Sequence, residues 1–220
     1  MKKIIYHGSE RIIERPEFGA GNHKNDYGIG FYCTEHLELA KEWASSESKD
    51  GFVNQYSIDL DNLKVLNLND KNYSILNWLA ILLENRTFDL KTPVAIQARE
   101  YLLANHLPDY KSYDIIVGYR ADDSYFSFSK AFLENGISLS QLQKAMYLGK
   151  LGEQVVLKSK EAFECIHFEQ YIPTDSEVYY PRKMARDRQA REAYFKMLEE
   201  SAEKDAVYMI DFIRKNDASL

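Results

Sequence analysis

The chain has 220 residues, enough for one well-filled core, and the usual size of domains makes one domain the first expectation. Hydrophobic residues make up 45% and charged residues 28%, proportions typical of a soluble globular protein. The net charge of -6 argues against a protein that holds duplex DNA through a general basic surface, although it leaves room for a local basic patch.

The N-terminal segment KKIIYH, residues 2–7, predicts a strand that ends at Gly8 and Ser9. His7 therefore lies at a strand end beside a glycine, where side chains commonly reach a ligand; a histidine satisfied within the turn is the alternative. The apolar run Ile4–Tyr6 is too short for a signal peptide, and no later segment reaches the length of a membrane span. We therefore expect a cytoplasmic protein.

Residues 25–44 combine a glycine turn, an aromatic strand and a short amphipathic helix. Gly28 and Gly30 allow positive φ or the close approach of another chain or a ligand. The run Phe31–Thr34 favours a strand, with one of its two aromatic rings facing a cleft and the other a core. Thr34 is placed to cap the helix, whose apolar residues recur at helical spacing.

The middle of the chain predicts two strands, then two helices and a further strand. The first two strands cover residues 52–60 and 64–68. The helices cover residues 73–85, capped by Asn69 or Asp70, and residues 93–105, with a proline in the first turn. Trp78 is expected in the core. The apolar run YDIIVGY, residues 113–119, is typical of a central strand covered on both faces.

The last third of the chain alternates short helices and strands before it becomes charged and helical. Asp122 and Asp123 lie in a loop, where we expect a solvated pair or a helix cap rather than catalysis. Helices are predicted over residues 126–133 and 139–148, the second capped by Ser138, and strands over residues 154–159 and 163–172, with His167 structural or exposed. Residues 173–176 are the best linker candidate, and the tail from residue 177 is expected to form two helices packed on the sheet.

Two cysteines, Cys33 and Cys165, lie in strand-like runs rather than in metal-ligand spacing. Buried free thiols in a reducing compartment are expected, and no metal site. Glu153 and Gln154 open the strand that follows Gly152. Neighbouring residues of a strand point to opposite faces, so only one of these two side chains can enter a shared cleft.

Three strand ends place polar or aromatic side chains beside glycine: YHGS at 6–9, GIGFYCT at 28–34 and GEQVVL at 152–157. In this order they resemble the ADP-ribosyltransferase superfamily, in the histidine–tyrosine–glutamate branch that includes diphtheria toxin and the poly(ADP-ribose) polymerases. The chain is most similar to a bacterial family of that branch catalogued as a domain of unknown function. The matching segments are residues 6–9, 26–34, 40–44, 114–123 and 154–159.

The resemblance implies an α+β fold with a split mixed β-sheet core, flanking helices and a helical C-terminal tail. Residues 1–175 would form the ADP-ribosyltransferase-like domain, and residues 176–220 a helical extension packed on the same domain. NAD would lie in a cleft of this core as a substrate.

The resemblance also implies the roles of individual residues. His7 would hold the ribose hydroxyls of the adenosine or the nicotinamide side, and the Gly8 backbone would pair with the nicotinamide amide. Tyr32 would stack on the nicotinamide ring, with Trp43 closing the same pocket. The implied NAD-binding set is completed by Ser9, Asp26 and Gly30.

The third catalytic position has two candidates. The superfamily places a glutamate directly before three apolar strand residues, a register that selects Gln154, whereas charge selects Glu153. Both remain candidates. A glutamine at this position would limit the reaction to single ADP-ribose units, or leave NAD binding without efficient turnover.

The expected function is transfer of ADP-ribose from NAD to a cytoplasmic macromolecule, either protein or nucleic acid. Breaking the nicotinamide bond gives an oxocarbenium-like sugar, which a nearby carboxylate or amide and an aromatic clamp on the leaving ring would stabilise. The resemblance allows a toxin role in a toxin–antitoxin or phage-defence system, with an antitoxin as partner and no membrane. The alternatives are a non-catalytic NAD-binding or protein-interaction module and an NAD glycohydrolase.

Overall fold

The computed structural model describes residues 2–121, 123–148, 152–200 and 204–217, which form the α+β class predicted from the sequence. Its strands are β1 (Lys2–Ser9), β2 (Phe31–Cys33), β3 (Gly51–Asp59), β4 (Val65–Asn67), β5 (Ile115–Tyr119), β6 (Glu153–Leu157) and β7 (Ile166–Thr174). Its helices are α1 (Leu37–Ala44), α2 (Ile75–Asn85), α3 (Pro93–Asn105), α4 (Asp123–Leu133), α5 (Leu139–Ala145), α6 (Lys160–Glu164), α7 (Ser176–Glu199) and α8 (Met209–Asp217).

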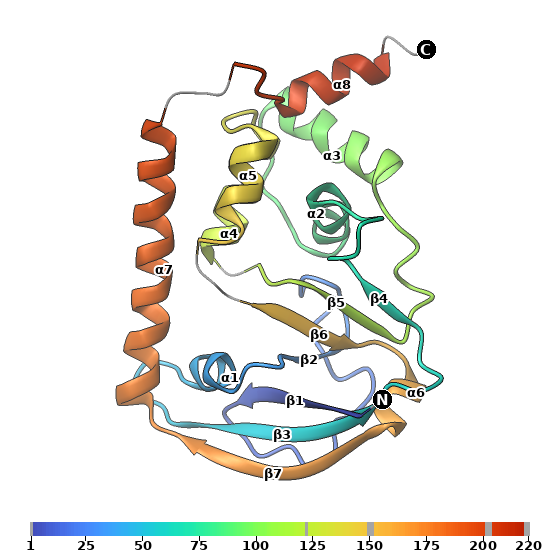
Figure 1. Cartoon of the computed structure of the whole chain (residues 1–220), viewed down its shortest axis with the longest axis vertical. Helices are drawn as coiled ribbons and strands as arrows, with labels where there is room; N and C mark the ends of the chain where they lie inside the picture. The colour runs from blue at the N-terminus through green and yellow to red at the C-terminus, as the bar shows by residue number, and fades with distance from the viewer. Residues whose placement is uncertain (1, 122, 149–151, 201–203, 218–220) are drawn as a thin grey trace.

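The strands form two sheets that lie one above the other (Figure 1). One sheet is antiparallel with the order β1-β3-β7, and the other is mixed with the order β2-β6-β5-β4, in which β4 and β5 run parallel. An apolar layer with Ile5, Phe31, Tyr56, Ile115 and Leu157 fills the space between them. β5 has a neighbour on each side and apolar residues on both faces, so the prediction of a central strand is confirmed.

The two sheets meet at one isolated bridge between Tyr6 of β1 and Thr34, just beyond β2. The Tyr6 N–H donates to the Thr34 carbonyl at 2.8 Å, and the Thr34 N–H donates to the Tyr6 carbonyl at 2.9 Å. From this bridge β1 continues with β3 in one sheet, while β2 pairs with β6 in the other. The sheets therefore part at the ends of β1 and β2, and this split opens beside His7.

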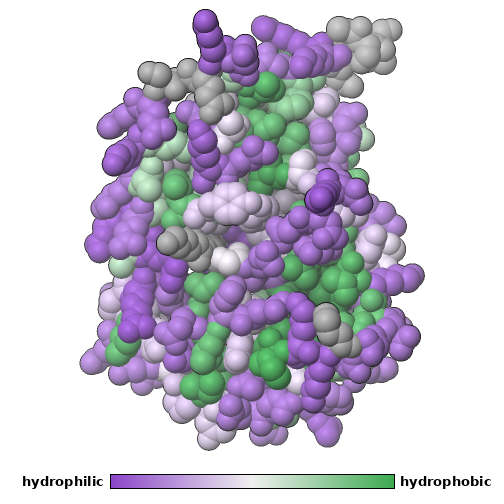
Figure 2. All heavy atoms as spheres, in the orientation of Figure 1, coloured by the Kyte–Doolittle hydropathy of each residue, from purple (hydrophilic) through white to green (hydrophobic). Residues whose placement is uncertain are grey.

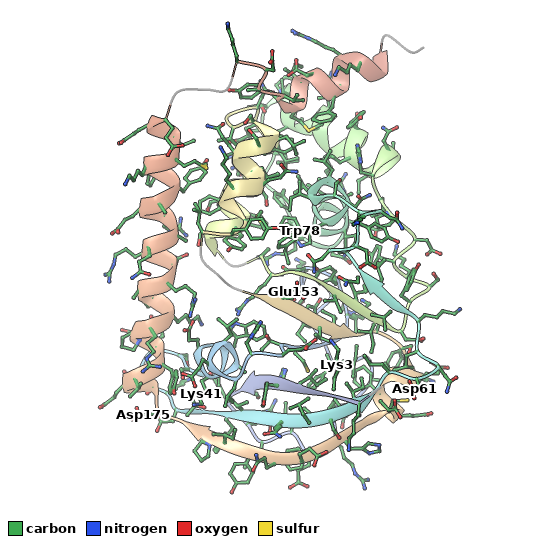
Figure 3. The ribbon with its side chains drawn as sticks, viewed as in Figure 1. Lys3, Lys41, Asp61, Trp78, Glu153 and Asp175 are labelled. Carbon is green, nitrogen blue, oxygen red and sulfur yellow. The ribbon has the colours of Figure 1, made fainter. Side chains whose placement is uncertain are left out.

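Helices α2 to α5 cover the other face of the four-stranded sheet, in the upper half of Figure 1. Trp78 of α2 is 1% exposed, which confirms its predicted place in the core. Its Nε1–H donates to the Tyr119 carbonyl at 3.1 Å, so the ring joins α2 to the end of β5 (Figure 3). The buried aromatic rings of α4, Tyr125, Phe128 and Phe132, extend the same core.

Two predicted helix caps are wrong: a nearer serine caps α2, and the N-cap residue of α1 makes no side-chain capping bond. Ser74 caps α2 in a capping box with Asn77, in place of Asn69 or Asp70. His36 occupies the N-cap position of α1, and Thr34 instead accepts the His36 N–H at 3.2 Å. The predicted start of α3 at Pro93 and the Ser138 cap of α5 are confirmed.

The predicted strand over residues 163–172 is only partly correct. Ser159 accepts the Ala162 N–H at 3.1 Å and caps the short helix α6, so β7 begins at Ile166. Cys165 lies between the two elements and is partly exposed, whereas Cys33 is buried; both thiols are free. His167 is exposed on β7, within the predicted alternatives.

The predicted linker over residues 173–176 is wrong, since β7 runs to Thr174 and α7 begins at Ser176. The Ser176 N–H and hydroxyl both donate to Asp50, each at 2.8 Å, which fixes the junction. The two tail helices pack on other helices rather than on a sheet: α7 on α1, α4 and α5, and α8 on α3. On the face shown in Figure 2, the outer edge along α7 is largely hydrophilic.

The predicted pair of acidic residues after β5 lies at the edge of what the structure describes. Asp122 is outside the described residues, and Asp123 is the first residue of α4. Among the described residues, no helix combines the length and the apolar character that a bilayer span needs.

Candidate functional site

A cleft of about 790 Å³ opens where β1 and β2 part. Its walls come from the ends of β1, β2 and β6, from helix α1 and from the loop between β1 and β2. Of the predicted site residues, seven line it: His7, Gly8, Asp26, Gly30, Tyr32, Trp43 and Gln154. Ser9 and Glu153 do not. The cleft therefore collects side chains from distant parts of the sequence.

His7 bridges the split between the two sheets. Its Nδ1 lies 2.7 Å from the Tyr32 carbonyl oxygen, and because a carbonyl only accepts, Nδ1 carries the proton. Nε2 is then the acceptor nitrogen of the ring. The imidazole stacks on Phe31 with 4.3 Å between ring centroids. Burial lowers the pKa of His7, so the neutral ring is favoured.

Gly8 is required by the close packing of α1 on β1. A Cβ at this position would lie 2.2 Å from the Ala40 carbonyl oxygen and 2.6 Å from the Ala44 nitrogen. The Gly8 backbone also faces the split. Tyr6 directs its N–H and C=O to Thr34, and since these directions alternate along a strand, Gly8 directs its own to the same side.

Tyr32 presents a fixed ring to the cleft. Its hydroxyl donates to the Gly28 carbonyl at 2.6 Å and accepts the Tyr27 N–H at 3.0 Å, so both roles of the hydroxyl are taken by the turn before β2. Burial raises the pKa of Tyr32 and keeps the phenol protonated. Tyr32 packs against the helical core and Phe31 against the layer between the sheets, as alternation predicts, although both residues border the cleft.

Lys158, which sequence reasoning missed, stabilises the glycine turn that binds the Tyr32 hydroxyl. The Lys158 ammonium donates to the carbonyls of Tyr27 and Ile29, each at 2.5 Å. Burial lowers the pKa of Lys158 to about 8. Gly28 has φ +73, which the turn requires. The signal in the sequence was a lysine directly after the apolar strand VVL, a place where a charged side chain needs a partner.

The structure separates the two candidates for the third catalytic position. Gln154 is 4% exposed and lines the cleft. Glu153 is exposed, lies outside the lining, and accepts a hydrogen bond from Asn69 at 2.8 Å (Figure 3). The register therefore brings Gln154, and not Glu153, together with His7 and Tyr32.

Asp26 lies beside Gln154 in the lining of the cleft and is 5% exposed. Its Oδ1 accepts from Arg86 at 2.9 Å, and its Oδ2 accepts the Ala121 N–H at 2.8 Å. The Gln154 Nε2 donates to the same Oδ2 at 3.2 Å. The Gln154 Oε1 is buried and has no hydrogen-bond partner among the described residues.

Trp43 forms the α1 side of the cleft. The Arg120 guanidinium lies over its ring, 4.1 Å from the centroid. The indole Nε1 is a second buried polar atom without a hydrogen-bond partner in the described part of the chain. Trp43 and Gln154 thus give the cleft one buried donor and one buried acceptor, which a polar ligand can satisfy.

Four arginines line the cleft: Arg11, Arg15, Arg86 and Arg120. The same lining contains three acidic residues, Glu14, Glu17 and Asp26, so the arginines give the cleft a small excess of positive charge in an acidic chain. Sequence reasoning missed them, because no spacing relates residues that only the fold brings together. The loop with Arg11 is anchored by buried Asn54, which accepts the Ile13 N–H at 2.8 Å and donates to the Arg11 carbonyl at 3.1 Å.

Ser9 serves this loop rather than the cleft. Its hydroxyl accepts the Arg11 N–H at 3.1 Å, at the point where the chain leaves β1. Ser9 therefore belongs to the turn that positions the loop, and its predicted place in the ligand-binding set finds no support in the lining.

Comparison with known families places this cleft in context. The model of the family described as "Protein of unknown function (DUF3990)" matches residues 3–168. The chain belongs to the DUF3990 family. This confirms the prediction of a family catalogued as a domain of unknown function. No curated protein and no solved structure matches the chain. The DUF3990 match includes every residue that lines the cleft, whereas α7 and α8 lie beyond it.

Proposed function

We propose that the chain has an ADP-ribosyltransferase-like fold, binds NAD in this cleft and transfers ADP-ribose to a macromolecular acceptor. One observation carries the proposal. The three segments that carry the resemblance, residues 6–9, 28–34 and 152–157, contribute His7, Tyr32 and Gln154 to the same cleft. A chance likeness of short motifs gives no reason for these side chains to converge.

The fixed parts of the cleft suit a bound nicotinamide nucleotide. The Tyr32 ring offers a flat apolar face for the nicotinamide, and the Gly8 N–H and C=O face the split, where they would pair with its amide. The arginines would balance the charge of the pyrophosphate. A ligand of this size fits a cleft of about 790 Å³.

The chemistry asks for stabilisation of a sugar cation. The bond between the ribose carbon and the nicotinamide nitrogen breaks, and nicotinamide leaves as a neutral molecule with the electron pair. The His7 Nε2 and the Gln154 Oε1 would accept hydrogen bonds from ribose hydroxyls, which makes the sugar more able to carry positive charge. A nucleophilic atom of the acceptor then forms the new bond to the same carbon.

The test is incubation of the pure protein with NAD labelled in its adenylate part and a bacterial lysate. Label on protein or nucleic acid supports the proposal. His7→Ala and Tyr32→Ala should each lower labelling by about a hundredfold or more while the thermal unfolding of the variants remains cooperative. Glu153→Gln, outside the cleft, is the matched control and should keep wild-type labelling. Full activity in both cleft variants would show that the site is wrong.

Gln154 supports a second candidate function. A neutral amide replaces the superfamily glutamate at this buried position, and this favours NAD binding without efficient turnover. Free ADP-ribose in the same assay, with no labelled macromolecule, would identify a glycohydrolase. NAD binding without cleavage would identify a non-catalytic module.

We also propose a toxin role, which rests on the resemblance alone and is tested separately. Induced expression of the wild-type chain in bacteria should arrest growth, and expression of His7→Ala should not. Growth arrest by both proteins would separate toxicity from the cleft.

A further inference from the structure

Asp26 is a buried carboxylate with a complete set of partners. It is 5% exposed, its Oδ1 accepts from Arg86 at 2.9 Å, and its Oδ2 accepts the Ala121 N–H at 2.8 Å. A buried carboxyl group needs such donors in place of water, and Arg86 and the Ala121 N–H supply them. Asp26 therefore presents an acceptor oxygen in a fixed place.

That fixed oxygen determines the orientation of the Gln154 amide. The Gln154 side chain lies 3.2 Å from the Asp26 Oδ2. The Oδ2 already accepts the Ala121 N–H, and an amide that faces such an acceptor turns its NH₂ toward Asp26 and its Oε1 away. The Oε1 is buried, has no hydrogen-bond partner in the described residues, and belongs to a side chain that lines the cleft.

We propose that Asp26, held by Arg86, is a positioning residue that locks the Gln154 carboxamide with Oε1 as the acceptor for a ribose hydroxyl of NAD. This inference rests on the proposed function. Asp26 was predicted from the resemblance to bind NAD directly; here it acts through Gln154, while its own oxygens are used by protein donors.

The same geometry explains why a glutamine suits this site. A glutamate at position 154 would bring a second carboxylate to the distance at which Gln154 now meets Asp26. Two carboxylates this close would repel each other, and neither could donate a hydrogen bond to the other. With Asp26 in place, the neutral amide is the side chain that gives a defined acceptor without that conflict.

The experiment compares Asp26→Asn, Gln154→Glu and the double variant. With its oxygen kept on Arg86, Asp26→Asn places NH₂ where Oδ2 was. This breaks the bond from the Ala121 N–H and lets the Gln154 amide reverse and present NH₂ to the cleft. We expect kcat for NAD cleavage to fall by about tenfold or more, the cost of one mismatched hydrogen bond, with KM changed less than threefold. The kcat of Gln154→Glu should fall by a similar factor. In the double variant, the introduced asparagine amide donates to the introduced glutamate carboxylate, and we expect at least half of the lost factor to return.

A second measurement detects the orientation of the Gln154 amide in the absence of NAD. The side-chain amide signal of Gln154, assigned by its loss in Gln154→Leu, should shift in ¹⁵N–¹H spectra of Asp26→Asn. It should stay in place in Glu153→Gln, whose site lies on the other face of β6. A purely structural role for Asp26 would lower stability but would not be reversed by Gln154→Glu.

Two results would overturn the inference: an unchanged Gln154 amide signal in Asp26→Asn, or a double variant no more active than Gln154→Glu. If Asp26→Asn does not fold, the activity of the double variant relative to that of Gln154→Glu still tests the inference. A wild-type chain that neither binds nor cleaves NAD overturns the proposed function and the ribose assignment together, and that outcome is visible without any variant.

Discussion

His7 combines two constraints at the scale of a single residue. Burial lowers its pKa, and donation from Nδ1 to Tyr32 leaves Nε2 as the acceptor. Protonation of Nε2 would remove that acceptor and place a charge in a buried site. We therefore expect NAD cleavage to be constant above the usual histidine pKa of 6.5 and to fall on the acid side, measured as kcat/KM against pH.

The contribution of His7 to the unfolding free energy should also fall at acid pH. The folded pKa lies below the unfolded value, so the unfolded chain binds more protons between the two values. The contribution of neutral His7 is present above pH 6.5 and is lost as the pH falls through the folded pKa. The difference in unfolding free energy between the wild type and His7→Gln should shrink over that window. A difference that does not change with pH would contradict the buried neutral ring.

Lys158 gives a prediction on the alkaline side. Its folded pKa is about 8 and its usual value is 10.5, so the unfolded chain binds more protons between these two values. The unfolding free energy of the wild type relative to Lys158→Met should therefore rise with pH across this window, as the penalty of a buried charge disappears. Urea titrations at either end of the window test this, with Lys49→Met as the control for an exposed lysine. A falling difference would mean that the ammonium is stabilised where it lies.

At the scale of elements, the contact between α1 and β1 depends on the missing side chain of Gly8. Gly8→Ala would place a Cβ 2.2 Å from the Ala40 carbonyl oxygen, so the helix must move. We expect a loss of about 1–3 kcal/mol in unfolding free energy and weaker NAD binding, because α1 carries Trp43. Gly19→Ala meets no atom within 4 Å but has φ +85, and should cost about 1 kcal/mol through the backbone alone. Chemical denaturation of both variants makes the comparison.

Helix α7 is clamped to α1 by ion pairs that differ in burial. Arg186 binds Glu42 with two hydrogen bonds, at 2.9 and 2.7 Å, and the Glu42 side chain is 5% exposed. Arg186→Gln should cost about 3 kcal/mol or more, because a buried carboxylate loses its partner. The neighbouring pair of Arg182 and Glu38, with side chains 55% and 58% exposed, is the matched control, and Arg182→Gln should cost less than about 1 kcal/mol. Equal losses would contradict this argument.

The elements that the sequence predicted well are those with a strong local signal. Pro93 and the pattern after it predicted α3, and the apolar run over residues 113–119 predicted β5. The errors are local competitions between caps: Ser74 took the start of α2, and Ser159 started a helix where a strand was predicted. Ser74 lies closer to the first free N–H groups of α2 than Asn69 or Asp70, and Ser159 accepts the Ala162 N–H at the start of α6.

Site residues could be predicted only where a polar or aromatic side chain lies next to a glycine turn in the sequence. His7, Tyr32 and Gln154 each lie at a strand end beside or near glycine. Arg86 and Lys158 carry no such signal, because their partners lie far away along the chain and are known only once the sheets are assembled.

At the scale of the whole molecule, the C-terminal helices complete the larger core. Buried side chains of α7 and α8 join it: Tyr194, Met197, Met209 and Ile213. Tyr194 stacks on Phe128 with 4.2 Å between ring centroids. A chain that ends at residue 175 should therefore unfold at lower temperature with reduced cooperativity and expose apolar surface, measured by circular dichroism and dye binding. A cooperative transition at the wild-type temperature would show that residues 2–175 are self-sufficient.

Phe31 of β2 pairs with Leu157 of β6, so the cleft can form only after most of the chain has been synthesised. His7 and Tyr32 are synthesised early, whereas Gln154 leaves the ribosome only after most of the chain has been made. Until then β2 has no β6 to pair with, and contacts so distant in sequence form late. If the proposed function is correct, a half-synthesised chain should therefore be unable to cleave NAD, and activity should appear only after residue 157 has left the ribosome.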